Sequence, residues 1–150
     1  MTSGQCGVNL PTVAMNLIQP QNTQLIRYPA RTVQRAERAM LCLPFQLSLF
    51  AAMRLQSVPL QAIAGKEGVE YHYTRRPISE LAVESGLTWL IQVGILRREV
   101  DGQGITDSFR LTPLGRQLVE KWELKGERLP PPSFLDRLYN ALSRWFRLPI

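Results

Sequence analysis

The order of turn residues and apolar segments between residues 87 and 122 constrains the fold of this chain most strongly. A helical pattern ends at Gly94, and an Asp-Gly-Gln-Gly turn at 101–104 separates two strand-like segments. Thr112 and Pro113 then supply a cap and a first residue for another helix. Because glycine accepts the left-handed conformation that ends many helices, Gly94 can pass the chain directly into a strand. The segments predicted to pair as an antiparallel hairpin are 95–100 and 108–111.

This order resembles the winged helix-turn-helix superfamily over about residues 45–124, most closely in the second half. The resemblance implies a mainly α fold with a small antiparallel β-hairpin (the wing), plus flanking N- and C-terminal helices. It also implies a third helix that enters the major groove of DNA and a wing that touches phosphates or the minor groove. The residues that carry the resemblance are Leu87, Leu90, Gly94, Ile95, Leu96, Arg97, Arg98, Phe109, Arg110, Leu111, Thr112, Pro113, Leu114, Gly115, Arg116 and Leu118.

Two assignments of the helices before Gly94 remain open. In one, 78–85 and 87–93 form the helix pair, which leaves a short recognition helix. In the other, 57–64 is the second helix and 78–93 is one continuous third helix that tolerates Gly86. We favour the second, although it requires a long insertion at 65–77. It predicts a buried stripe of Ile78, Leu81, Ala82, Leu87, Leu90, Ile91 and Val93, and an outward face of Ser79, Glu80, Val83, Glu84, Thr88 and Gln92.

The rest of the chain divides at its prolines and glycines. Residues 1–30 are expected to be an extended or partly disordered arm, and 31–129 a winged-helix domain whose N-terminal helix is capped by Thr32 and interrupted at Pro44. Three consecutive prolines at 130–132 form a spacer before an amphipathic helix at 133–150, which Ser133 and Asp136 can cap. Further expectations are an N-cap at Ser57, helix breaks at Gly65 and Gly68, and a strand over 69–74 with Tyr71 and Tyr73 on one face.

The net charge of +6 favours an acidic partner, and the excess lies at the two ends of the chain. Residues 1–56 carry +4, 57–129 are neutral, and 130–150 carry +2. We predict a regulatory, cytoplasmic and dimeric protein that binds duplex DNA, with Thr88 and Gln92 near base edges. Local acidic side chains on the outward helix face and on the wing oppose this prediction. The predicted phosphate contacts are Arg75, Arg76, Arg97, Arg98 and Arg110.

The alternative function is a winged-helix protein-interaction or assembly module. The last helix is expected to carry aromatic and aliphatic side chains on one broad face and arginines opposite. Such a helix docks or dimerises, or else lies on an anionic membrane. The residues predicted to form this interaction or membrane helix are Phe134, Leu138, Leu142, Trp145 and Phe146.

Composition leaves little material for catalysis or metal binding. His72 is the only histidine, Cys6 and Cys42 are the only cysteines, and no phosphate loop or nucleophile motif is present. We therefore expect no enzymatic activity, cofactor, metal site or small-molecule substrate. Two isolated cysteines and no signal-peptide pattern are typical of a cytoplasmic protein.

Overall fold

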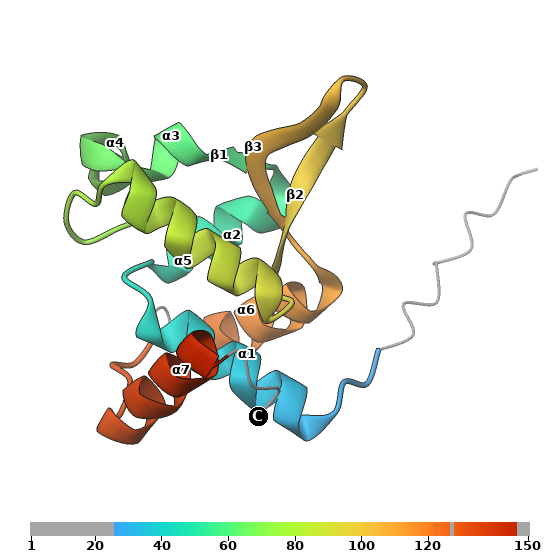
Figure 1. The fold of residues 1–150 in the computed structure, drawn as a ribbon, viewed down its shortest axis with the longest axis vertical. Coiled ribbons are helices and arrows are strands. Elements are labelled where there is room, and N and C mark those ends of the chain that lie inside the picture. Colours follow the sequence, from blue (N-terminus) through green and yellow to red (C-terminus); the bar gives the residue numbers. More distant parts are fainter. Residues whose placement is uncertain (1–25, 127, 147–150) are drawn as a thin grey trace, which may run out of the picture.

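The computed structural model describes residues 26–126 and 128–146, and in these residues the chain is mostly helical with one small antiparallel sheet (Figure 1). The predicted fold class, mainly α with a β-hairpin and flanking helices, is confirmed. The expected arm lies almost wholly in residues 1–25, outside the described part. The elements are α1 (Ala30–Cys42), α2 (Leu47–Leu55), β1 (Val58–Pro59), α3 (Leu60–Ile63), α4 (Gly65–Glu70), α5 (Glu80–Gln92), β2 (Leu96–Asp101), β3 (Gly104–Leu111), α6 (Pro113–Gly126) and α7 (Phe134–Phe146).

The sheet has the strand order β1-β3-β2, with both pairings antiparallel. The predicted hairpin is confirmed, with Leu96 opposite Leu111 and a bulge between Arg98 and Val100. Its second strand begins at Gly104, four residues earlier than expected. The hairpin projects from the helices, so that its tip forms one end of the molecule (Figure 1).

Gly94 forms the corner between α5 and the hairpin, as predicted. Its φ of +85° lies in the left-handed region that favours glycine. The Thr112 hydroxyl donates to the Gly94 carbonyl and also accepts the backbone N–H of Gly115 at 3.2 Å. Thr112 therefore caps α6 and ties its start to the end of α5.

A single continuous helix, α5, contains Gly86 and precedes this corner, which confirms the longer third helix. The Ser79 hydroxyl accepts the Ala82 N–H and caps it. The expected faces are wrong at three positions: Val83 is fully buried, whereas Leu81 is 78% exposed and Ala82 is also exposed. Val83, Leu87 and Leu90 follow the spacing of three and four residues that places side chains on one helix face, and this face packs on the core.

The expected break at Gly65 is confirmed, because α3 ends at Ile63 and Gly65, whose φ is +64°, begins a separate helix. The expected break at Gly68 and the expected strand over 69–74 are wrong. Gly68 lies inside α4, where an added Cβ would lie 2.0 Å from the Ile63 carbonyl oxygen. That close approach explains why glycine stands inside the helix. The chain then turns through His72, whose φ is +59°, and only Thr74 forms a β-bridge, with Phe45.

The expected helix at 57–64 is also wrong in its first half. Val58 and Pro59 form β1 opposite Phe109 and Ser108, and helix α3 begins only at Leu60. Because β1 lies at the sheet edge, the missing N–H of Pro59 disturbs no central pairing.

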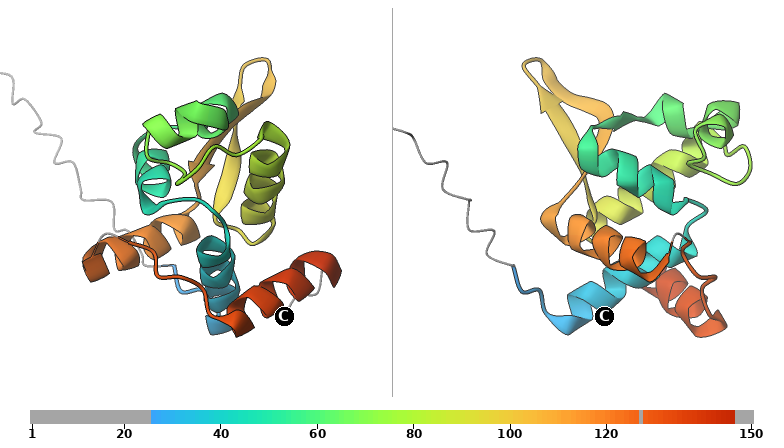
Figure 2. Two further views of the ribbon diagram at one scale, coloured as in Figure 1. Left: turned by 90° about the vertical axis from the view of Figure 1, so that its left-hand side faces the viewer. Right: turned by 180° about the vertical axis from the view of Figure 1, so that it is seen from behind.

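The two terminal helices follow the predicted boundaries closely. Helix α1 begins at Ala30, two residues before the expected cap, and ends before Pro44. At α7, Ser133 Oγ accepts the Asp136 N–H at 3.1 Å and the Asp136 carboxylate accepts the Ser133 N–H at 3.2 Å, which confirms the capping box. Helices α1 and α7 contact each other at the end of the molecule opposite the hairpin tip (Figure 2).

Candidate interaction surfaces

Two of the predicted phosphate-binding arginines are engaged by carboxylates of the chain itself. The Arg98 guanidinium donates to Asp107 Oδ1 at 3.0 Å and lies 3.4 Å from Glu84 Oε1. Arg110 donates to Glu99 Oε1 at 3.1 Å. These pairs leave the two guanidiniums less than one-third exposed. A phosphate group would therefore have to displace carboxylates to reach either arginine.

The other three predicted arginines are exposed and form no ion pair with a described residue. Arg75 and Arg76 lie in the segment that leads into α5, whereas Arg97 lies on β2, after the helix. Arg75 also lines a shallow hollow of about 310 Å³ together with Arg128. The arginines that could contact a phosphate backbone therefore lie before and after α5, and the five predicted arginines do not form one cluster.

The outward surface of α5 holds the two residues predicted to meet base edges. Thr88 and Gln92 line the same hollow, of about 360 Å³, which Arg144 of α7 closes on one side. The Arg144 guanidinium donates to the hydroxyl of Ser85 on α5. Helix α7 therefore lies against the surface that a duplex would have to approach, and Glu84 adds a carboxylate to it.

The tip of the hairpin carries apolar and acidic side chains. Val100 and Ile105 lie opposite each other and are largely exposed. Asp101 accepts the backbone N–H of Gln103 at 2.8 Å, which closes the turn. With neither Lys nor Arg between Glu99 and Phe109, the tip offers no cationic side chain to a phosphate.

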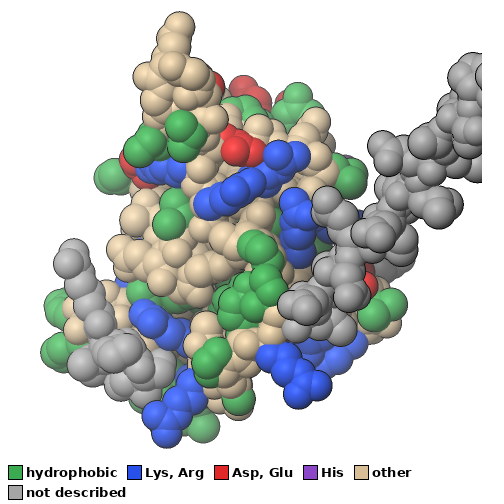
Figure 3. Space-filling view, turned by 90° about the vertical axis from the view of Figure 1, so that its right-hand side faces the viewer, with side chains coloured by type: hydrophobic (Ala, Val, Ile, Leu, Met, Phe, Trp, Pro, Cys, Tyr) green, Lys and Arg blue, Asp and Glu red, His purple; other side chains and the backbone are tan. Residues whose placement is uncertain are grey.

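Basic side chains are spread over the face that contains the hairpin, and apolar side chains separate them (Figure 3). A duplex-binding surface usually gathers its arginines and lysines into a continuous patch. On this face, the charge distribution gives weak support to duplex binding.

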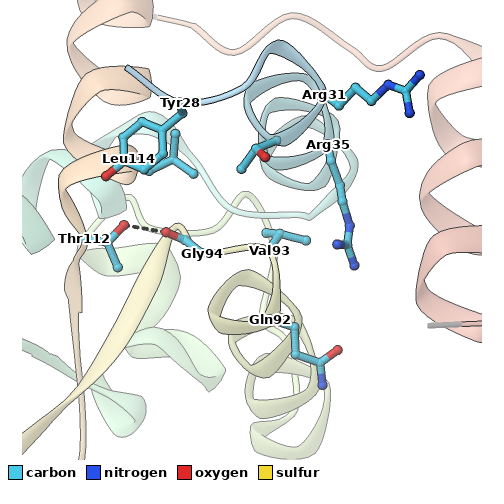
Figure 4. Close-up of a pocket in the computed structure, with 9 residues that line it drawn as sticks. Tyr28, Arg31, Arg35, Gln92, Val93, Gly94, Thr112 and Leu114 are labelled. Carbon is cyan, nitrogen blue, oxygen red and sulfur yellow. Dashed lines mark hydrogen bonds between the residues drawn. The ribbon is translucent and has the colours of Figure 1, made fainter. Parts of the chain in front are cut away.

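A cavity of about 350 Å³ lies between α1 and the C-terminal end of α5 (Figure 4). Arg35 extends beside Gln92 and Val93, and its Cζ lies 5.4 Å from the centre of the Trp89 ring, whereas Arg31 points away. The carbonyl end of a helix is electronegative, so an arginine at this place stabilises α5. No His, Cys, Asp or Glu lines this cavity, which therefore offers no acid–base or nucleophilic group of those types.

Helix α7 exposes the side chains that were predicted to form an interaction surface. Trp145 is 85% exposed and Phe134 is 78% exposed. The exposed side chains extend along the whole helix and share one face. We call this set the α7 apolar face: Phe134, Leu135, Leu138, Leu142, Trp145 and Phe146.

Polar residues of α7 make its contacts with the rest of the chain. The indole Nε1–H of Trp89 donates to Asn140 Oδ1 at 2.9 Å, and Asp136 pairs with Arg38 at 3.4 Å. Ser143 is the most buried residue of the helix, at 7% exposure. Asp136, Asn140 and Ser143 follow a spacing of about one helical turn. The helix is therefore docked by its polar side and presents its apolar side to solvent.

Two groups at or near this contact have shifted pKa values. A hydrogen bond from the Ser133 side chain, joined by the Arg38 charge, lowers the pKa of Asp136. Burial, followed by the charge of Asp136, raises the pKa of the Cys42 thiol on α1. The pKa of Cys42 therefore depends in part on the position of α7, whereas the main cause of the Asp136 shift lies at the start of α7 itself.

The contacts that orient α7 were not predicted from the sequence. Arg38, Trp89, Asn140 and Arg144 come from three helices, and no local spacing connects them. The capping box predicted where α7 begins but carries no information about which face docks.

Among the described residues, no group of three or more His, Cys, Asp or Glu side chains could hold a metal ion. None of the helices in this part of the chain combines the length and the apolar character that crossing a bilayer requires.

No curated protein and no solved structure matches this chain. A family model does match, over residues 26–144, which include all ten helices and strands except the last two residues of α7. The chain therefore belongs to the Npun_F0494-like family.

Proposed function

We propose that this chain is a non-enzymatic winged-helix protein of the cytoplasm that docks onto another surface through the α7 apolar face. The observation that carries the proposal is the orientation of α7. Its polar side is used for contacts within the chain, and six large apolar side chains are left in water. Burying one such side chain contributes about 1.5–3 kcal/mol, so a partner that covers this face gains substantial free energy.

The element order supports the winged-helix assignment. A short strand follows α2, α5 passes through Gly94 into a hairpin, and the short strand pairs with the returning strand β3. In this superfamily, the helix before the wing and the wing itself contact DNA or proteins. Here α7 lies beside that helix, which supports docking over groove insertion.

The size of native complexes tests the docking function. The tagged chain should migrate in gently prepared extracts above its own 17.1 kDa. Leu138→Glu, which introduces a charge into the α7 apolar face, should return it to the monomer position. Leu124→Glu on α6 is the matched control, because Leu124 is 83% exposed but lies outside this face. Wild-type protein that is monomeric in every extract and in purified form, and that also binds no membrane, would contradict the proposal.

Duplex DNA binding is the second candidate function, with a homodimer as its expected form. The exposed side chains of Arg75, Arg76 and Arg97, which form no ion pair with described residues, favour it. A salt titration of binding to duplex DNA tests it, and Arg97→Ala should reduce the slope of log K against log salt by about 1. Arg116→Ala is the control: Arg116 is an exposed residue of α6, and its removal should leave this slope unchanged. Absence of duplex binding at low salt would exclude this candidate.

A further inference from the structure

We propose that the partner of the α7 apolar face is the surface of an anionic lipid bilayer, on which α7 lies parallel to the membrane. This inference rests on the proposed docking function and names its partner. It joins three observations: the composition of the exposed face, the charge that surrounds it, and its place at one end of the molecule.

The exposed face has the composition of an interfacial helix. Phe134, Trp145 and Phe146 are aromatic, and Leu138 and Leu142 lie between them along the helix. Indole and phenyl rings favour the boundary between headgroups and acyl chains. With 13 residues, α7 is about 20 Å long, which suits a position in the plane of the membrane.

The charge around this face favours an anionic lipid surface. Helices α1 and α7 together contain five arginines against Glu37 and Asp136, which leaves +3. Arg38 is paired with Asp136, but Arg31 and Arg137 are exposed and form no ion pair with a described residue. The charge of these two arginines therefore remains available to lipid phosphates. Basic residues beside an apolar face strengthen binding to anionic membranes.

The same charge disfavours a second copy of the chain as the partner. A two-fold interface places each surface against itself, so the arginines that flank one α7 would face those of the other. Arg137 is exposed and forms no ion pair with a described residue. Like charges brought together across an interface suppress association.

The position of α7 allows a flat surface to reach it. Helices α1 and α7 lie at the end of the molecule opposite the hairpin, and α7 is on the outside in both views (Figure 2). The apolar face is turned away from the contacts with Trp89 and Arg38, so a bilayer can cover it without displacing them.

Vesicle flotation with the full 150-residue chain tests the inference. The probes are vesicles of phosphatidylcholine alone and vesicles of phosphatidylcholine mixed equally with phosphatidylglycerol. Wild-type protein should float with the mixed vesicles. Leu138→Glu should weaken this binding by about tenfold or more, because one apolar side chain no longer enters the membrane. Leu124→Glu should bind like the wild type.

Arg137→Gln tests the electrostatic part separately. It should weaken binding to the mixed vesicles by about fivefold and leave binding to pure phosphatidylcholine unchanged. Far-ultraviolet circular dichroism establishes that each variant retains its helices. Vesicle binding by Arg137→Gln tests the inference even if Leu138→Glu does not fold.

Two outcomes would overturn the membrane assignment in distinguishable ways. If wild-type protein ignores both vesicles but sediments as a dimer that Leu138→Glu dissociates, the partner is a second copy and the docking function stands. If wild-type protein neither binds vesicles nor forms complexes in extracts, the inference and the proposed function both fail. Equal flotation of the wild type and Leu138→Glu also overturns the membrane assignment.

Discussion

The indole Nε1–H of Trp89 on α5 donates a hydrogen bond of 2.9 Å to Asn140 Oδ1 on α7. The two residues are 51 positions apart in the sequence, and Trp89 is almost fully buried beneath Arg35 and α7. Through this bond, the helix that precedes the hairpin holds the helix that carries the exposed apolar face.

Asn140→Ala should lower the free energy of unfolding by about 1–3 kcal/mol, because the buried indole N–H of Trp89 loses its acceptor. Urea unfolding measures this change. Trp89→Phe, alone and combined with Asn140→Ala, completes a double-mutant cycle, and the double variant should lose less stability than the sum of the two single variants. Gln34→Ala on α1, which removes an exposed amide, is the control. Additive effects of the two substitutions would show that the hydrogen bond contributes nothing.

Acid should loosen α7. The pKa of Asp136 is held below its ordinary value of 3.8 by the Ser133 hydroxyl and by Arg38. A carboxyl group whose pKa is lowered by folding stabilises the protein above its unfolded pKa, and this contribution is lost as the pH falls through the folded value. The urea midpoint should therefore fall as the pH drops below about 4.

Asp136→Asn should remove this part of the pH dependence, because an amide does not titrate in this range. The neutral-pH stability of the variant should be lower than that of the wild type, since the capping bond to the Ser133 N–H and the pairing with Arg38 are weakened. Identical pH profiles for wild type and variant would contradict the assignment to Asp136.

Cys42 should react slowly with iodoacetamide at neutral pH, because burial raises the pKa of its thiol above the ordinary value of 9.0. The thiolate is the reacting form. In a Cys6→Ser background, the rate should rise with a midpoint above pH 9.0. Asp136→Asn should lower that midpoint, since the negative charge that disfavours the thiolate is gone. An unchanged midpoint would show that Asp136 does not act on this cysteine.

Local signals in the sequence predicted the hairpin and the helix ends. These signals set the backbone conformation of only a few neighbouring residues, as at Gly94, at the turn 101–104, and at Thr112 with Pro113. Such preferences are visible in a short stretch of chain, so the order of helix, hairpin and helix could be predicted. The helix cap at Ser133 and Asp136 belongs to the same class.

Tertiary contacts decided what the sequence could not predict. The alternating pattern of 69–74 is typical of a strand, but residues 69–70 end α4, in which Gly68 allows the close approach to Ile63, and the chain then turns at His72. The two residues Val58 and Pro59 form a strand because β3 is available as a partner. The orientation of α7 likewise depends on Trp89, which lies in another helix.

Gly94→Ala should destabilise the protein by about 1 kcal/mol, because an alanine at a φ of +85° is strained whereas glycine is not. The nearest heavy atom to an added Cβ would be Leu114 Cδ2 at 3.7 Å, an ordinary contact, so the cost comes from the backbone. Gly102→Ala is the control, since nothing lies within 4 Å and its φ is not positive. Thermal unfolding of both variants measures the difference, and an equal loss in each would show that the corner at Gly94 requires no glycine.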